Sequence, residues 1–231
     1  WVHTSEGPRQ VRDLVGRPFG AVVDGTTHAS DPAGFFPTGR KPVTRLVTRE
    51  GYALRLTADH PVRRVAAMTR FRLDGEWTQA GALRPGDRIV LNDHRAMPDW
   101  AGPGTDGEGY LIGLLVGDGT LKADKAVLSV WSRRRAANAE SEISGVEGVM
   151  AAALAAARAL PHRGDFAGWT EVAGRGEHRL ALGALRRLAI ELGMAPGNKV
   201  VTPAIERASA AFCRGFLRGF FDADGTVLGD H

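Results

Sequence analysis

The sequence has little sulfur and no long hydrophobic run. Its 231 residues include one cysteine, Cys213, so an intramolecular disulfide is excluded and a reducing, intracellular compartment is favoured. No stretch approaches the roughly 18 uninterrupted apolar residues of a membrane span. The first residues also lack the basic-then-apolar pattern of a signal peptide. We therefore expect a cytoplasmic protein with no membrane partner.

A strong charge imbalance is missing too, since the formal net charge is only +4. Some arginines nevertheless occur in short clusters, of which the cluster Arg133, Arg134 and Arg135 follows an expected strand at 126–131. Arginine suits phosphate groups and guanine edges, so we expect these three side chains to contact DNA. An equally open alternative is that they begin a solvated helix over 134–160.

Two segments, 111–119 and 217–225, share an apolar, glycine-spaced pattern that ends in Asp-Gly. Glycines lie four residues apart in both regions: Gly113 and Gly117 in the first segment, and Gly219 in the second with Gly215 just before it. Glycine costs about 1 kcal/mol in a helix, and its recurrence on one face indicates two helices that pack backbone to backbone in parallel. This packing places Asp118 and Asp224 side by side, and adjacent carboxylates favour a bound cation.

Both segments resemble the LAGLIDADG motif of dodecapeptide-type homing endonucleases. Asp118 and Asp224 match the family's last, metal-binding acid, whereas the earlier acid is kept as Asp222 and replaced by Val116 in the first copy. The resemblance implies a monomeric pseudo-dimer that cleaves both strands of double-stranded DNA with Mg²⁺ or Mn²⁺. It also implies a basic side chain beside the metals. Lys199 precedes the second motif, but we expect it to be a surface lysine.

The first hundred residues alternate apolar and polar side chains in short bursts broken by Gly and Pro, which is typical of an all-β unit. The bursts span 9–14, 19–23, 43–48, 52–56, 71–73 and 88–91.

Segment 51–62 resembles the second splicing block of inteins and hedgehog-type (Hint) domains, through Thr57 and His60. The resemblance implies that His60 protonates the departing nitrogen at the first splice junction, since imidazole titrates near neutrality. Thr57 would orient that peptide bond. The open alternative is a turn with a solvent-facing histidine.

We therefore expect a multi-domain chain. A partial all-β Hint domain spans 1–100, a linker spans 101–108, and a partial α+β LAGLIDADG domain spans 109–231, with one αββαββα-like repeat and the first helix of a second. The expected helices lie at 109–117, 134–160, 179–193 and 203–222, and the expected strands at 126–131 and 166–173.

An intein begins with a Cys or Ser nucleophile and ends with His-Asn, and neither end occurs here. We expect a fragment of a bifunctional intein that splices and cuts DNA in its full-length form and does neither as given. Its flanking partners would be host-protein segments (exteins), with a ribonucleotide reductase as the host. Two alternatives remain: a LAGLIDADG-type DNA-binding regulator without splicing, and a hedgehog-like autoprocessing domain without nuclease activity.

Overall fold

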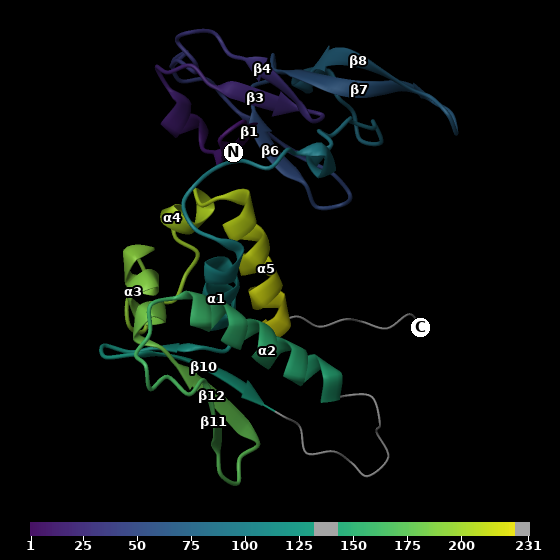
Figure 1. Cartoon of the computed structure of the whole chain (residues 1–231). Coiled ribbons are helices and arrows are strands. Elements are labelled where there is room, and N and C mark those ends of the chain that lie inside the picture. Colours follow the sequence, from purple (N-terminus) through teal and green to yellow (C-terminus); the bar gives the residue numbers. More distant parts are fainter. Residues whose placement is uncertain (132–142, 225–231) are drawn as a thin grey trace. The chain divides into compact units, whose positions relative to one another are not determined.

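The chain forms two compact units. The computed structural model describes residues 1–131 and 143–224, so Arg133, Arg134 and Arg135 lie outside the described residues (Figure 1). One unit, here the β unit, holds Val2–Thr4 and Gln10–Pro98, and the other, the α+β unit, holds Trp1, Ser5–Arg9 and the chain from Asp99 onward. The division falls just before the boundary expected at residue 100.

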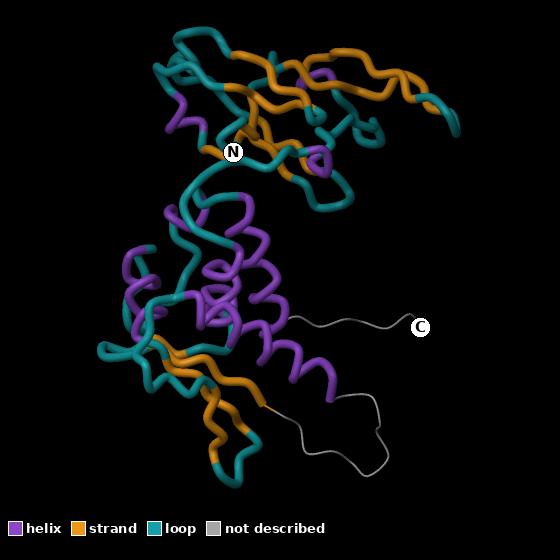
Figure 2. The backbone as a smooth tube through the Cα atoms, in the orientation of Figure 1, coloured by secondary structure: helices purple, strands orange, loops and turns teal. Residues whose placement is uncertain are grey.

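The β unit consists of short antiparallel strands, drawn in orange in Figure 2. Its strands are β1 (Val2–Thr4), β3 (Gly20–Val23), β4 (Thr26–Ala29), β5 (Thr44–Val47), β6 (Ala53–Leu56), β7 (Pro61–Met68) and β8 (Leu73–Gln79). Strand β3 pairs with both β1 and β4, while β5–β6 and β7–β8 form two hairpins. Three 3-10 helices complete it: Val11–Leu14, Ala80–Ala82 and His94–Ala96. A further short strand, β2 (Gly7–Arg9), belongs to the N-terminal piece of the other unit.

Three expected strands of the β unit take other forms. Segment 9–14 becomes a 3-10 helix, Val11–Leu14, closed by the Asp13 amide donating to the Gln10 carbonyl. Segment 71–73 is mostly the β7–β8 turn, because the Thr69 hydroxyl accepts from the following amides and stabilises a Ser/Thr-type turn. Segment 88–91 pairs with β7 only through a single bridge, Arg64 to Ile89.

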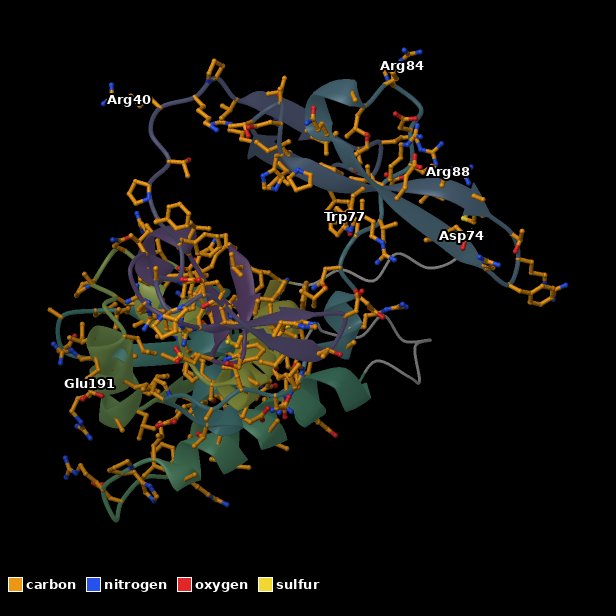
Figure 3. The ribbon with its side chains drawn as sticks, turned by 90° about the horizontal axis from the view of Figure 1, so that it is seen from above. Arg40, Asp74, Trp77, Arg84, Arg88 and Glu191 are labelled. Carbon is orange, nitrogen blue, oxygen red and sulfur yellow. The ribbon has the colours of Figure 1, made fainter. Side chains whose placement is uncertain are left out.

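The β unit buries few large side chains completely. Leu14, Val22 and Leu56 are at most 6% exposed, whereas Trp77 on β8 is 73% exposed and is labelled in Figure 3. The remaining exposed apolar side chains include Val43, Val47, Tyr52, Leu54 and Leu91.

From Asp106 onward the described part of the α+β unit runs in the order helix, two strands, helix, two strands, three helices. Its elements are α1 (Asp106–Val116), β9 (Thr120–Leu121), β10 (Ala126–Trp131), α2 (Ile143–Ala159), β11 (Trp169–Val172), β12 (Glu177–Ala181), α3 (Gly183–Glu191), α4 (Pro203–Glu206) and α5 (Ala210–Asp224). The strands form one antiparallel sheet in the order β11-β12-β10-β9. The chain is therefore a multi-domain protein with antiparallel sheets and an α+β unit.

The helices of the α+β unit cover one face of this sheet (Figure 1). Leu128 on β10 and Leu180 on β12 are at most 1% exposed and pack with Leu111, Leu115 and Phe212 in the core. Because side chains alternate along a strand, the neighbours of these two leucines point to the opposite face. That opposite face lines a groove.

The expected helix 179–193 is wrong over its first residues. Segment 177–181 is strand β12, because it pairs with β10 on one side and β11 on the other, and helix α3 begins only at Gly183. The expected helix 203–222 is divided into α4 and α5, since the Ser209 hydroxyl accepts from the Phe212 amide and starts a new helix.

The segment expected as a linker, 101–108, is packed onto the α+β unit. Ser209 donates its amide to the Pro103 carbonyl and its hydroxyl to the Gly104 carbonyl. Helix α1 begins within the segment, because Thr105 and Glu108 form a reciprocal capping box. The Thr-x-x-Glu pattern is a helix-start signal that the glycine and proline content of the segment obscured.

No helix in the part of the chain that the structure describes is both long enough and apolar enough to cross a membrane.

Candidate functional site

Helices α1 and α5 pack through their glycines. A Cβ atom placed on Gly113 would lie 2.1 Å from the Phe216 carbonyl oxygen, and one placed on Gly219 would lie 2.2 Å from the Tyr110 carbonyl oxygen. Neither distance is compatible with a side chain, so the two backbones are in direct contact.

The remaining glycines of the two motifs lie along the same contact. A Cβ on Gly215 would meet the Asp106 carbonyl at 2.0 Å, and one on Gly117 would meet the Ala223 methyl at 2.5 Å. The residue numbers of the contacting positions increase together along both helices, so α1 and α5 run parallel. The structure thus brings Gly113, Gly117, Gly215 and Gly219 to one interface. Gly109, which sequence reasoning missed, extends the same four-residue spacing and also belongs to it.

Polar groups beside the glycine contact fix the register of the pair. The Tyr110 hydroxyl donates to Asp222 at 2.7 Å, and the Arg218 guanidinium lies 4.5 Å from the Tyr110 ring centroid and binds Asp106 at 3.0 Å. Burial, followed by the Asp222 carboxylate, raises the pKa of Tyr110 well above its ordinary value. Asp222, the earlier acid of the second motif, therefore joins the two helices.

The last acids of the two motifs meet at the ends of α1 and α5. Asp118 follows α1 after Gly117, and Asp224 is the last residue of α5. A Cβ on Gly117 would lie only 3.2 Å from an Asp224 carboxylate oxygen. Partial burial, and then the negative charge of Asp224, raise the pKa of Asp118. The structure therefore brings the two predicted metal ligands into electrostatic contact.

Lys199 lies beside these acids, and its assignment as a surface lysine is wrong. The side chain is half-buried, and its ammonium donates to the carbonyls of Leu115 at 2.9 Å, of Val116 and Gly117 at 3.3 Å each, and of Gly119. These are carbonyls at the end of α1, which lack partners within the helix. Burial lowers the pKa of Lys199, while Asp118 and Asp224 oppose that shift.

The fit of this site to a divalent cation depends on its donor atoms. The described residues contain no group of three or more His, Cys, Asp and Glu side chains that could hold a metal. Mg²⁺, however, commonly binds through one or two carboxylates together with water and substrate phosphates. Asp118 and Asp224 supply such a pair, and the repulsion between the two neighbouring carboxylates favours a cation between them.

An open groove of about 1160 Å³ extends from Asp118 over the uncovered face of the sheet. Its described lining carries six Lys and Arg side chains against three Asp and Glu side chains. The cations are Lys122, Lys125, Arg163, Arg175, Arg179 and Arg187. Sequence reasoning missed them because they are scattered along the chain, and only the sheet assembles them into one basic surface.

Thr57 and His60 lie in the turn between β6 and β7. The His60 amide donates to the Thr57 carbonyl at 3.1 Å, and the Thr57 hydroxyl bonds Asp59 and lowers its pKa. The His60 side chain is exposed and lines an open, mainly apolar groove of about 400 Å³ within the β unit. Leu46, Tyr52, Leu54 and Trp77 are among its other lining residues.

A glycine pair gives a direct test of the helix contact. Gly219→Ala is expected to destabilise the α+β unit by about 1–3 kcal/mol, the usual range for overpacking. Gly148→Ala, on the open side of α2, is the matched control and should stabilise by up to about 1 kcal/mol through helix propensity. Urea unfolding followed by circular dichroism at 222 nm reports this unit, since it contains all the α-helices. Equal effects at both positions would contradict the close contact.

The raised pKa of Asp118 predicts a pH-dependent stability. Folding favours the protonated form of Asp118. The free energy of unfolding therefore falls as the pH rises from 3.8, the ordinary pKa of the group, through its higher folded pKa, and this cost is absent below 3.8. Asp118→Asn should therefore raise the urea midpoint at pH 7 and have little effect at pH 3. Millimolar Mg²⁺ should stabilise the original chain but not the variant.

Asp165→Asn serves as the control for this experiment, because Asp165 lines the same groove and pairs with Arg163. It should retain the stabilisation by Mg²⁺. Equal stabilisation of the original chain and Asp118→Asn would mean that the cation binds elsewhere.

Comparison with known proteins gives limited information. No family model matches the chain. A segment of 85 residues, 36% of the chain, is 40% identical to part of the replicative DNA helicase DnaB of Rhodothermus marinus. The matched segment spans 8% of that helicase's length.

Proposed function

We propose that this chain belongs to a bifunctional intein, with a Hint splicing unit followed by a LAGLIDADG homing endonuclease that cleaves double-stranded DNA. One observation carries the nuclease part. The parallel, backbone-close pairing of α1 and α5 brings the terminal acids of both motifs together at one end of a basic groove. A purely structural helix pair has no need for two facing carboxylates in that place.

Each group of residues in the site would have its own role in phosphodiester hydrolysis. Asp118 and Asp224 would hold Mg²⁺ or Mn²⁺, which supplies an activated water and stabilises the leaving oxygen when bound. Lys199 holds a positive charge next to both acids, and it fixes the end of α1 through four carbonyls. The basic groove binds the phosphates of the duplex and excludes other orientations.

The splicing part of the proposal is carried by the β unit. His60 lies in a turn after β6, with its ring open to a groove, so it can reach a peptide bond placed there. We assign to it the protonation of the departing nitrogen and assign to Thr57 the orientation of the bond. A hedgehog-like autoprocessing domain shares this chemistry but gives no reason for the paired acids, and a DNA-binding regulator gives no reason for the Thr57 and His60 block.

The helicase match does not identify a host protein, and a ribonucleotide reductase host remains our prediction. A Cys or Ser codon in the DNA within about ten residues upstream of Trp1, where the acyl acceptor of an intein is required, would support the splicing assignment. The surrounding reading frame would identify the host. An upstream sequence without either codon would count against splicing.

The groove predicts salt-dependent binding of duplex DNA. Six cations line the groove, and Arg163 and Arg179 among them are paired with lining acids, so about four to five phosphates can be neutralised. A plot of log K against log salt should then have a slope of roughly −3.5 to −4.5. Arg175→Ala should reduce that slope by about 1. Fluorescence anisotropy of a labelled random duplex at several salt concentrations measures both quantities.

Arg84→Ala is the matched control, because Arg84 lies on an exposed loop of the β unit (Figure 3) and is not one of the residues that line the groove. It should leave the slope unchanged. The groove would not be the DNA-binding surface if Arg84→Ala and Arg175→Ala had the same effect, or if the chain failed to bind duplex DNA at 50 mM salt.

A further inference from the structure

An ion pair occupies the floor of the basic groove. Glu177 and Arg179 lie two residues apart on β12 and both line the groove, while Leu180 points to the core. In the sheet, Arg179 lies opposite Ser129 on β10 and Thr170 on β11. Since β12 is flanked by strands on both sides, Arg179 stands on an interior strand, away from the turns at the ends of the sheet.

The carboxylate of this pair is buried although it faces the groove. Glu177 is 4% exposed, whereas the Arg179 side chain is 47% exposed. The Arg179 guanidinium, then the Ser129 hydroxyl and the charge of Arg175, hold the pKa of Glu177 below its ordinary value against the effect of burial. A carboxylate in this position is ionised near neutral pH and acts as a fixed anchor below the guanidinium.

The geometry of the pair leaves one edge of the guanidinium available. Arg179 donates from Nε to one Glu177 oxygen at 2.7 Å and from Nη2 to the other at 3.0 Å. A guanidinium has five N–H donors in a rigid plane, so both Nη1 hydrogens and the second Nη2 hydrogen remain. Among the described residues, Glu177 is the acceptor that Arg179 engages. The Nη1–Nη2 edge is therefore a two-donor fork with a fixed orientation.

The other cations of the groove are placed differently. Lys122 and Lys125 flank the β9–β10 turn, and Arg175 lies in the β11–β12 turn. Cations in turns at the ends of strands reach phosphates readily, and a phosphate needs no buried carboxylate to orient its partner. A guanidinium that a buried carboxylate holds in a fixed orientation, in the middle of a sheet, instead suits two acceptor atoms that lie in one plane, such as those on the edge of a base.

From this arrangement we propose that Arg179 reads a guanine in the major groove of the bound duplex and that Glu177 is the positioning residue that orients it. Guanine offers O6 and N7 as two parallel acceptors, and the major groove admits a two-stranded β-ribbon. The β11–β12 hairpin supplies such a pair of strands, with β11 at the edge of the sheet. This inference rests on the proposed DNA-binding function and adds a specificity determinant to it.

Selection of duplexes from a randomised library at 50 mM salt, with the original chain and its variants, tests the proposal. The original chain should enrich guanine at one position. Arg179→Lys, which keeps the charge and loses the fork, should reduce that preference by roughly 5- to 150-fold. Glu177→Gln should weaken the same preference while leaving overall affinity within about threefold, because it frees the guanidinium without removing a cation.

Two further variants keep the test decisive. The double variant Glu177→Gln with Arg179→Met leaves no unpaired buried carboxylate, so it controls for misfolding, and it too should lose the guanine preference. Lys125→Ala should weaken binding to all sequences alike and reduce the salt slope by about 1. An unchanged guanine preference in Arg179→Lys and in the double variant would overturn the proposal.

Two other results distinguish failure of the Arg179 proposal from failure of the DNA-binding function. If Arg179→Lys behaved like Lys125→Ala, with a changed salt slope and an unchanged sequence profile, Arg179 would be a phosphate contact and the proposal would be wrong. If the original chain bound no duplex at all, the DNA-binding function itself would fail, and this inference would fall with it.

Discussion

Asp224→Asn is expected to abolish double-strand cleavage by the active endonuclease, lowering the rate by more than about 10²-fold, since even residues that only support metal ligands contribute 10- to 100-fold. Asp118→Asn should have the same effect. Each substitution removes a carboxylate from the pair at the ends of α1 and α5 but removes no cation from the groove. Affinity for duplex DNA should therefore stay within a few-fold of its original value.

Asp222→Asn is the matched control on the same helix, two residues before Asp224. Its side chain accepts the Tyr110 hydroxyl bond at 2.7 Å, which an amide oxygen can also accept, so cleavage should persist. The measurement is linearisation of a plasmid that carries the cognate site, in Mg²⁺, alongside a binding assay. Full cleavage by Asp118→Asn or Asp224→Asn, or parallel loss of binding and cleavage, would mean that these acids only end their helices.

Sequence reasoning located the helix pair because the information is local. Glycine every four residues marks one face of a helix, and two such faces can meet only through their backbones. The spacing therefore anticipated that Gly113 and Gly219 lie at a contact, and it placed Asp118 and Asp224 at the same end. In the structure, the atom nearest to a Cβ placed on either glycine is a backbone carbonyl oxygen of the other helix.

Lys199 could not be found in the same way. Its partners, the carbonyls from Leu115 to Gly119, lie some 80 residues earlier in the chain. The residues next to Lys199 in the sequence do not indicate that contact. A turn at 195–198, with Gly197 at positive φ, directs the lysine toward α1, and only the fold shows where the turn points.

The floor of the basic groove was missed for a different reason. Segment 179–193 contains strong helix formers, so local propensity predicts a helix from its first residue. Pairing with β10 and β11 outweighs that propensity and places Arg179 in a strand. The error hid the alternation that puts Glu177 and Arg179 on one face and Leu180 on the other. Local preference is weak evidence wherever a segment is flanked by strands on both sides.

In the β unit, the sequence resemblance identified two residues but not their hydrogen-bond partners. The Thr57 and His60 block was identified from its resemblance, and the structure places it in a tight turn. The Thr57 hydroxyl is already engaged with Asp59. A hydroxyl that donates to Asp59 keeps its acceptor lone pairs, so Thr57 can still accept from the N–H of a peptide bond during splicing. Asp59→Asn should therefore alter the rate of the first step less than Thr57→Val does.

His60→Ala is expected to slow the first acyl shift of a splicing-competent intein that contains this chain by about 10²–10⁴-fold, the range that general acid–base groups provide. The reason is that the departing amide nitrogen needs a proton, and the His60 ring is exposed to the groove of the β unit, where it can supply one. His28→Ala, at an exposed histidine on β4, is the matched control and should leave the rate unchanged. The measurement is thiol-induced cleavage at the first splice junction across pH 5–9, which also reports the pKa of the group that acts. An unchanged rate in His60→Ala would show that His60 is only a turn residue, whereas equal losses in both variants would point to a general effect on the fold.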